Sequence, residues 1–285
     1  MTAPGEVTRE AGAADGTRLL EATGLNLRFG GVHSLAGVDL ALDRGEVLAV
    51  IGPNGAGKTS LFNCLTGVYR PQTGSIRYLT KTGAMLDVIG RKPHQITRLG
   101  VARTFQNIRL FAALTALENV KVGVEAGQHT GPVAAMLGMP WARREERESN
   151  DRACELLEFV GLTHRTNAVA SSLPYGEQRR LEIARGLATD PQILLLDEPA
   201  AGTNPSEKRD LEALISSIHR RDVSVLLIEH DMRLVMSVAT RVVVLNFGRV
   251  IAAGTPEQVQ RDPAVIEAYL GSVDDENGAG DAAHG

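Results

Sequence analysis

Short runs of apolar and polar residues near the start of the chain predict β-strands. The runs at 19–23, 25–29 and 38–42 lie between Gly and Asp turn residues, which is typical of antiparallel strands. Residues 47–51 are apolar throughout, as expected of a strand that is covered on both faces. A further short strand is predicted at 74–78. The first part of the chain therefore predicts an antiparallel β layer beside a buried parallel strand.

The middle of the chain changes to helical periodicity. Apolar residues at 116–120 and 153–160 recur with the i, i+3, i+4 spacing of amphipathic helices. Between them, 127–141 is rich in Gly, Pro and small residues, and 142–152 is dense in charge. We interpret the charged run as a solvated helix face. Together these patterns predict an α-helical subdomain at about 100–175.

Beyond residue 176 the predicted helices and strands alternate. Helices are predicted at 177–187, 207–218 and 233–238, and strands at 193–196, 223–228 and 242–245. Such alternation indicates a parallel sheet, so the predicted fold class is α/β. The chain carries neither an internal repeat nor a second nucleotide-binding pattern.

Composition narrows the class of protein. An apolar content of 43% and a charged content of 22% are those of a globular domain, here predicted at 18–271. The ends, 1–17 and 272–285, are small and polar and are expected to be disordered. The net charge of −4 argues against bulk nucleic-acid binding. Cys64 and Cys154 are expected to be reduced thiols. With no signal peptide and no apolar run of roughly 18 residues, we expect a cytoplasmic protein that can still dock on a membrane protein.

One loop carries the strongest chemical signal. Its residues fit the phosphate-binding pattern G-x-x-x-x-G-K-[ST] and are Gly52, Pro53, Asn54, Gly55, Ala56, Gly57, Lys58 and Thr59. A predicted strand precedes the loop and a predicted helix starts at Ser60, so an ordinary Gly-rich turn is the weaker interpretation. Lys58 is expected to contact the β- and γ-phosphates, and the Thr59 hydroxyl to ligate Mg²⁺. The fold is therefore predicted to be a P-loop NTPase with a RecA-like parallel sheet.

Two later strands end in groups suited to nucleotide hydrolysis. Asp197 and Glu198 close the apolar run at 193–196. Such acids commonly mark only a turn to solvent, but in a P-loop protein Asp197 is expected to hold Mg²⁺ and Glu198 to act as general base. His230 follows the run at 223–228, where a lone histidine is often structural. Because ligands bind at the carboxyl edge of such sheets, we predict that His230 contacts the γ-phosphate and Glu198.

A second helix start lies between these elements. The segment 173–185 makes a tight turn at Gly176 and enters a helix, whose first residues could bind a phosphate. One P-loop cannot use two such sites on the same nucleotide. Tyr175, Gly176 and Glu177 are therefore predicted to contact the ATP of a second subunit that faces the first.

With these motifs, the chain resembles the ATP-binding subunits of ABC transporters over residues 19–270. The motifs that carry the resemblance are the P-loop, Gln106 as the Q-loop glutamine, 173–178 as the signature, Asp197 with Glu198 as the second nucleotide motif, His230 as the switch histidine and Phe29 as the adenine-stacking aromatic. The resemblance implies that Gln106 contributes to catalysis and to Mg²⁺ binding, and that ATP is the cofactor.

Several segments are similar to one branch of that family, the ATPases of high-affinity branched-chain amino-acid importers (the LivG type). They are 28–32, 62–67, 103–106, 179–185, 228–232, 254–257 and 268–271. This resemblance implies import of leucine, isoleucine and valine at the cytoplasmic face of a bacterial inner membrane. The implied partners are a second ATPase subunit, identical or distinct, two permease subunits and, indirectly, a substrate-binding protein, with no nucleic acid.

Other functions remain open in the sequence. The same type of ATPase subunit could energise transport of urea or other amides, or export of lipopolysaccharide. A soluble ABC ATPase of translation or DNA repair would usually carry two cassettes or a long coiled-coil insertion. A small-molecule kinase or GTPase would lack the 173–185 segment and the His230 strand. Leu110 and Phe111 could line a groove for a permease loop or belong to the core.

Three residues depart from the family pattern. Pro174 replaces the usual signature Ser and so removes a hydroxyl donor. This predicts slower or more tightly gated hydrolysis, because losing one oriented donor can cost on the order of 10²-fold in rate. Glu177 replaces Gln and adds a negative charge that must be compensated or turned away. Asn204 stands where the family commonly has Asp, at a cross-subunit contact to the P-loop.

Overall fold

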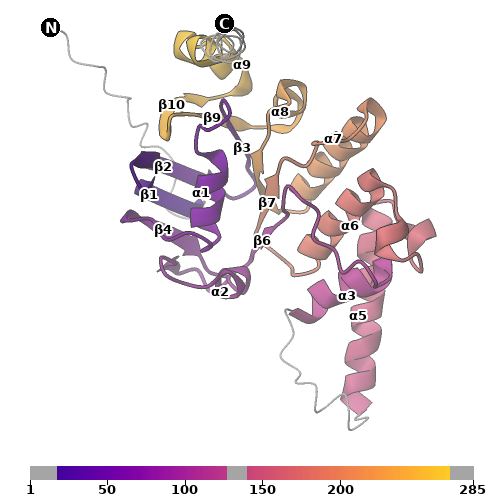
Figure 1. Ribbon diagram of the computed structural model, residues 1–285. Coiled ribbons are helices and arrows are strands. Elements are labelled where there is room, and N and C mark those ends of the chain that lie inside the picture. Colours follow the sequence, from indigo (N-terminus) through magenta and orange to yellow (C-terminus); the bar gives the residue numbers. More distant parts are fainter. Residues whose placement is uncertain (1–17, 127–139, 270–285) are drawn as a thin grey trace, which may run out of the picture.

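The computed structural model describes residues 18–126 and 140–269. Two β-sheets lie together in this part of the chain, and a group of helices projects to one side (Figure 1). The ends that were expected to be disordered, 1–17 and 272–285, lie outside the described residues, as does most of the Gly-rich segment, 127–139.

The first sheet is antiparallel and has the strand order β2-β1-β4-β5. Its strands are β1 (Arg18–Phe29), β2 (Val32–Asp43), β4 (Thr73–Leu79) and β5 (Met85–Asp87). The prediction of two strands at 19–23 and 25–29 is wrong, because β1 is continuous. Gly24, with a φ of 60°, lies where the pairing with β2 shifts register, and its N–H donates to Asp39 at 2.6 Å. Gly24 therefore bends the strand without ending it.

The second sheet has the order β10-β9-β3-β8-β7-β6 and forms the centre of the protein. Its strands are β3 (Val47–Ile51), β6 (Val101–Arg103), β7 (Ile193–Asp197), β8 (Ser224–Ile228), β9 (Arg241–Asn246) and β10 (Arg249–Gly254). Neighbouring strands from β9 to β6 pair in parallel, and β10 returns antiparallel to β9. All residues of β3, β7 and β8 are buried, which explains their apolar sequences. The α/β prediction is confirmed.

One part of the predicted helical segment is a strand. Val101–Arg103 pairs with β7 as the edge strand β6. Three residues are too few for a periodic pattern, so only the pairing with Ile193–Asp197 makes them a strand. The helical arm therefore begins after β6.

The helices follow the predicted order and are mostly longer than predicted. They are α1 (Lys58–Leu65), α2 (Pro93–Thr97), α3 (Ala116–Ala126), α5 (Pro140–Phe159), α6 (Tyr175–Leu187), α7 (Pro205–His219), α8 (Met232–Val238) and α9 (Pro256–Gln260), with 3₁₀ turns at Thr163–Arg165 and Ala170–Ser172 and a final helix over 263–269. In Figure 1, α3, α5 and α6 form the arm that lies away from β1, β2 and β4. Within the charged run, 144–148 is largely exposed, as predicted for a solvated face.

Apolar side chains form separate clusters on the two sides of the central sheet. One fills the space between the two sheets around α1, and includes Leu48, Phe62 and Leu226. The other joins the opposite side of the sheet to α3, α5, α6 and α7, and includes Val120 and Leu157. Each such side chain stabilises the fold by about 1.5–3 kcal/mol when fully buried. The carboxyl edge of the sheet is thereby held rigidly from both sides.

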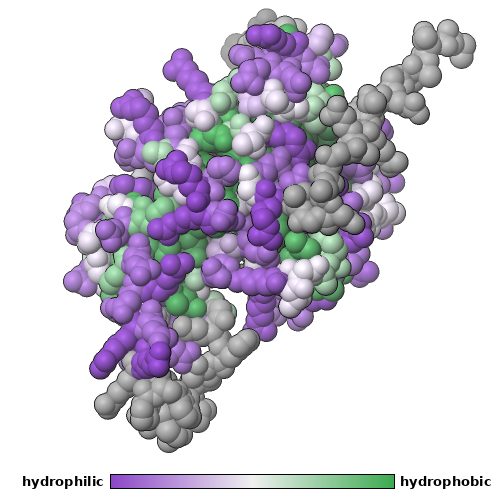
Figure 2. Space-filling view, turned by 180° about the vertical axis from the view of Figure 1, so that it is seen from behind, coloured by the Kyte–Doolittle hydropathy of each residue, from purple (hydrophilic) through white to green (hydrophobic). Residues whose placement is uncertain are grey.

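One face of the protein is mainly polar. Hydrophilic side chains cover most of the face shown in Figure 2, with smaller apolar patches between them. Among the helices of residues 18–126 and 140–269, none combines the length and the apolar character that crossing a membrane requires.

Candidate nucleotide site

The predicted phosphate loop connects the carboxyl end of β3 to the start of α1, which begins at Lys58. Two of its glycines are required by close backbone contacts. A Cβ on Gly52 would lie 2.0 Å from the Leu245 carbonyl oxygen, and one on Gly57, whose φ is 103°, would lie 2.4 Å from the Ser34 carbonyl oxygen. The loop can therefore curl against β9 and β2 only without side chains at these positions.

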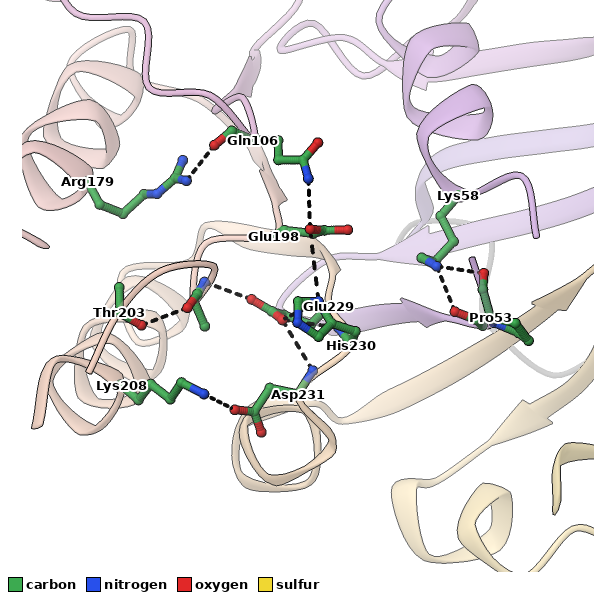
Figure 3. Close-up of polar contacts among 12 residues, drawn as sticks. Pro53, Lys58, Gln106, Arg179, Glu198, Thr203, Lys208, Glu229, His230 and Asp231 are labelled. Carbon is green, nitrogen blue, oxygen red and sulfur yellow. Dashed lines mark hydrogen bonds and ion pairs between the residues drawn. The ribbon is translucent and has the colours of Figure 1, made fainter. Parts of the chain in front are cut away.

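Lys58 lies inside this loop and is 7% exposed. Its Nζ donates to the carbonyl oxygens of Gly52 at 2.6 Å and Pro53 at 3.0 Å (Figure 3). Burial lowers the pKa of Lys58, and the nearby carboxylates of Glu198 and Asp197 oppose that shift. The ammonium group is therefore positioned at the carboxyl edge of the sheet together with both predicted acids.

The remaining loop residues differ in exposure. Asn54, Gly55 and Thr59 are exposed, and Pro53 is half-buried. Ala56 is buried, and its N–H donates to the Pro53 carbonyl at 3.2 Å. The Ser60 hydroxyl contacts that of Ser34 at 2.7 Å, which ties the start of α1 to β2.

Asp197 ends β7 and is 4% exposed. Its Oδ2 accepts from Arg103 Nη2 at 2.8 Å, a partner that was not predicted from the sequence. The second terminal nitrogen of Arg103, Nη1, donates to Asn63 on α1 at 2.8 Å and to Thr66 at the end of α1 at 2.9 Å. Arg103 therefore orients the carboxylate of Asp197 relative to the helix that follows the phosphate loop.

Glu198 lies on the turn directly after β7. Its backbone φ of 45° is one that residues other than Gly rarely adopt. Gln106 Nε2 donates to Glu198 Oε2 at 3.0 Å, and His230 Nδ1 lies 3.9 Å from the same oxygen. The His230 side chain is 64% exposed, and its Nδ1 also lies 3.8 Å from Glu229 Oε2. The structure thus brings together three of the predicted catalytic residues, Gln106, Glu198 and His230 (Figure 3).

The predicted Mg²⁺ ligands have suitable chemistry. The Thr59 hydroxyl, the second carboxylate oxygen of Asp197 and the amide oxygen of Gln106 are hard oxygen donors of the kind Mg²⁺ prefers. In the described part of the chain, no group of three or more His, Cys, Asp or Glu side chains could hold a metal by itself. These residues fit an ion that is shared with phosphate oxygens and water.

Phe29 lies at the end of β1, 49% exposed. Its ring meets that of Tyr69 edge-on, with centroids 5.2 Å apart. Tyr69 follows α1 and was not predicted. It supports the open face of Phe29 as a platform on which an adenine ring could stack.

The turn at 174–177 begins α6. Tyr175 is 43% exposed, whereas a Cβ on Gly176 would lie 2.4 Å from a carboxylate oxygen of Glu207. The charge of Glu177 is compensated as expected, because its carboxylate accepts from Arg165 at 3.0 Å and lies 3.5 Å from His164. In Figure 3, Arg179 of the same helix lies on the opposite side of Glu198 from Lys58.

Two buried groups of the site were missed. Glu229 is fully buried and accepts from the backbone N–H groups of Ala200 at 2.7 Å, His230 at 3.1 Å and Asp231 at 3.3 Å. Burial raises its pKa, and these hydrogen bonds oppose the rise. An acid directly after an apolar strand was the available signal.

The second missed group is the pair Arg179 and Glu182, both on α6. Their i, i+3 spacing on a predicted helix was the signal, but only the structure shows that the pair is buried.

The sequence matches two protein families. Residues 35–201 match the family described as ABC transporter, and residues 249–275 match that described as branched-chain amino acid ATP-binding cassette transporter. The chain is 50% identical over 256 residues to the high-affinity branched-chain amino acid transport ATP-binding protein BraF of Pseudomonas aeruginosa, an alignment that covers 90% of this chain and 98% of that protein. It is 47% identical over the same length to the corresponding protein LivG of Escherichia coli K12, with the same coverage.

A solved structure is also similar to this one. A crystal structure of the ADP conformation of an ATP-binding cassette of an ABC transporter superposes with a TM-score of 0.76 at 30% identity, covering 89% of this chain and 99% of that one. The similarity therefore extends over both sheets and the helical arm.

Proposed function

The chain belongs to the ABC transporter family, in its branch of branched-chain amino acid ATP-binding cassettes, and we propose how its site performs the work of that family. It is the ATP-hydrolysing subunit of an importer for branched-chain amino acids. The observation that carries the proposed mechanism is the convergence of Lys58, Glu198 and His230 at one edge of the central sheet.

In this proposal the phosphates of ATP lie in the loop 52–59, with Lys58 at the β- and γ-phosphates. The adenine stacks on Phe29. Ser60 adds a contact at the start of α1, where the helix dipole favours anions. Lys58 would exchange its two loop carbonyls for phosphate oxygens, which are better partners for a buried ammonium group.

Glu198 orients the attacking water and accepts its proton, while His230 and Gln106 hold the carboxylate and the γ-phosphate. Thr59, Asp197 and Gln106 would hold Mg²⁺, which neutralises charge on the phosphates. The positive φ of Glu198 directs its side chain toward Gln106 and His230, at the expense of local strain.

The working unit in this proposal has two ATPase subunits. Each ATP lies between the loop 52–59 of one subunit and the residues Tyr175, Gly176 and Glu177 of the other. The single P-loop and the second helix start, at α6, support this arrangement. Since the γ-phosphate is satisfied only when both faces meet, hydrolysis opens the pair. The partner is a second copy or a sister subunit.

The remaining partners are two permease subunits and, through them, a substrate-binding protein. The site of action is the cytoplasmic face of the inner membrane, with 18–271 acting as one ATPase domain. Leu110 packs against the core, whereas Phe111 is 48% exposed. Phe111 is therefore the residue of this pair that we assign to the permease groove.

The mechanism predicts distinct effects of two substitutions. Lys58→Ala should abolish ATP turnover, because it removes the charge that binds the phosphates. Glu198→Gln should bind ATP without hydrolysing it and should elute as a dimer with ATP and Mg²⁺. Matched controls are Lys81→Ala and Glu155→Gln, which change exposed residues on other elements and should leave turnover unchanged.

A monomeric elution profile of Glu198→Gln with ATP would contradict the two-subunit mechanism, and unchanged turnover in Lys58→Ala would contradict the site. Uptake of labelled leucine should fall in cells that carry Lys58→Ala in place of the wild type. Loss of labelled urea uptake instead would identify the substrate as an amide.

A further inference from the structure

A buried ion pair joins α6 to the loop that contains Gln106. Arg179 is 1% exposed and is the largest fully buried side chain in the described part of the chain, and Glu182 is also 1% exposed. We propose that Arg179 and Glu182 are a positioning pair that makes the turn 174–177 move with the loop 105–109, so that ATP at Lys58 repositions the turn that faces the partner's ATP. The inference rests on the two-subunit arrangement proposed above.

The guanidinium group of Arg179 contacts both segments at once. Nη1 donates to the carbonyl oxygen of Phe105 at 2.6 Å and to Glu182 at 2.9 Å. Nη2 donates to the carbonyl oxygen of Gln106 at 2.8 Å and to the Tyr175 hydroxyl at 3.1 Å (Figure 3 shows the Gln106 contact). A planar guanidinium holds these directions rigidly, which the single nitrogen of a lysine cannot do. Displacing the loop therefore displaces Tyr175.

Glu182 completes the connection from the acceptor side. Its Oε1 accepts from the N–H of Arg109 at 3.1 Å and from that of Phe105 at 3.4 Å. Burial raises the pKa of Glu182, and the hydrogen bond from Arg109 and the charge of Arg179 oppose this. Phe105 is thus held through both its N–H and its carbonyl group.

The role of the Arg179–Glu182 pair is better explained by the position that it gives the loop 105–109 than by a contribution to stability. A buried ion pair contributes little more to stability than apolar residues of the same volume would, because both charges lose their hydration. What this pair provides is one defined position of the loop against α6. Such buried networks change between discrete arrangements and do not deform continuously.

The other end of the connection is the site of hydrolysis. The side chain of Gln106 donates to Glu198 at 3.0 Å, while its carbonyl group is held by Arg179. A nucleotide that engages Gln106 and Glu198 therefore shifts the same backbone segment that Arg179 grips. The contacts run without a gap from Glu198 through Gln106 and Arg179 to Tyr175.

The test measures amide hydrogen exchange of residues 173–178 in protein dilute enough to elute as a monomer, with and without ATP and Mg²⁺. In the wild type, ATP should change exchange in this segment. The double variant Arg179→Met with Glu182→Gln removes both charges together and keeps a carbonyl oxygen for the two loop N–H groups. It should still bind ATP, because Lys58 and the rest of the loop 52–59 are unchanged, but exchange at 173–178 should no longer respond.

A matched control removes a different ion pair. Arg241→Met with Glu46→Gln breaks a 2.6 Å contact between β9 and the turn before β3, and should keep the ATP response. If the Arg179 double variant is too unstable, Arg179→Lys keeps the charge and should lose at least half of the response. A wild-type response in either Arg179 variant, or no response in the wild type, would overturn the inference. These outcomes are separate from dimer formation by Glu198→Gln, whose failure would overturn the two-subunit proposal itself.

Discussion

At the end of β7 the carboxylate of Asp197 meets the guanidinium group of Arg103, with both side chains less than a tenth exposed. The same guanidinium lies over the rings of Phe62 at 5.7 Å and Phe105 at 5.0 Å. Apolar and aromatic surroundings exclude water, so the carboxylate of Asp197 depends on the guanidinium group of Arg103 to replace its hydration. At the scale of single residues, buried charges of this kind set the positions of the groups that we propose to hold ATP.

Arg103→Met should therefore destabilise the protein by about 3–5 kcal/mol, since it leaves Asp197 buried without its partner. Unfolding in urea, followed by circular dichroism, measures this change. Activity should also require more Mg²⁺, because the carboxylate loses its orientation. Arg103→Lys keeps the charge but cannot contact Asp197 and the end of α1 at the same time. It should therefore be more stable than Arg103→Met but less stable than the wild type. Wild-type stability in Arg103→Met would show that the pair contributes nothing.

At the scale of elements, the ends of strands and helices carry the site. Asn204 caps α7, because its side chain accepts from the N–H groups of Ser206 at 2.9 Å and Glu207 at 3.0 Å. In return, the N–H of Asn204 donates to the carboxylate of Glu207 at 2.9 Å. This capping box holds the segment that follows Glu198, and Lys208 on α7 pairs with Asp231 at 2.6 Å. The start of α7 thus ties the turn after β7 to the residues after β8.

Asn204→Ala should lower the free energy of unfolding by about 1 kcal/mol, as loss of a cap does elsewhere. Asn204→Asp is the matched control, because aspartate caps equally well, and it should stay within about 0.5 kcal/mol of the wild type. Thermal unfolding of both variants checks this. Equal stability of Asn204→Ala and the wild type would mean that the observed capping contacts are not important in solution. The Asp variant also restores the residue that the family commonly has, so a gain in turnover there would report the cross-subunit contact.

At the scale of the whole molecule, α1 connects the nucleotide loop to the core. Cys64 lies on this helix, in the cluster between the two sheets, and is 2% exposed. Burial raises the pKa of its thiol to about 11. The ordinary pKa of a cysteine thiol is 9.0, so the unfolded chain loses this proton at lower pH than the folded protein does. The contribution of Cys64 to the free energy of unfolding is therefore lost as the pH rises above 9.0. Cys154 is exposed on α5 and serves as an internal comparison.

At about pH 8 a thiol reagent should label Cys154 rapidly and Cys64 only when the core opens. ATP with Mg²⁺ at about 100 times its dissociation constant should slow labelling of Cys64 about a hundredfold, since ATP binds the folded state. Mass spectrometry of labelled peptides follows both sites, and Cys154→Ser removes the fast one. Rapid labelling of Cys64 without ATP would contradict the described core.

Patterns local in the chain were sufficient to predict much of this protein. The loop 52–59, the acids at the end of β7 and the histidine after β8 each lie at or just beyond the end of a fully buried strand, close to it in sequence. Parallel strands place their carboxyl ends on one edge, so the sequence predicted that these groups would meet. Local pattern was insufficient for β6, whose three residues form a strand only by pairing with β7.

Only the tertiary structure decided which charged side chains are buried and what they hold. Arg103 reaches Asp197 across 94 positions of the chain, Arg179 reaches Phe105 across 74, and Glu229 reaches Ala200 across 29. In sequence these residues look like ordinary polar positions of helices and strand ends. Burial is a property of how the elements pack around a side chain, and a charge becomes a positioning group only where packing has removed its water.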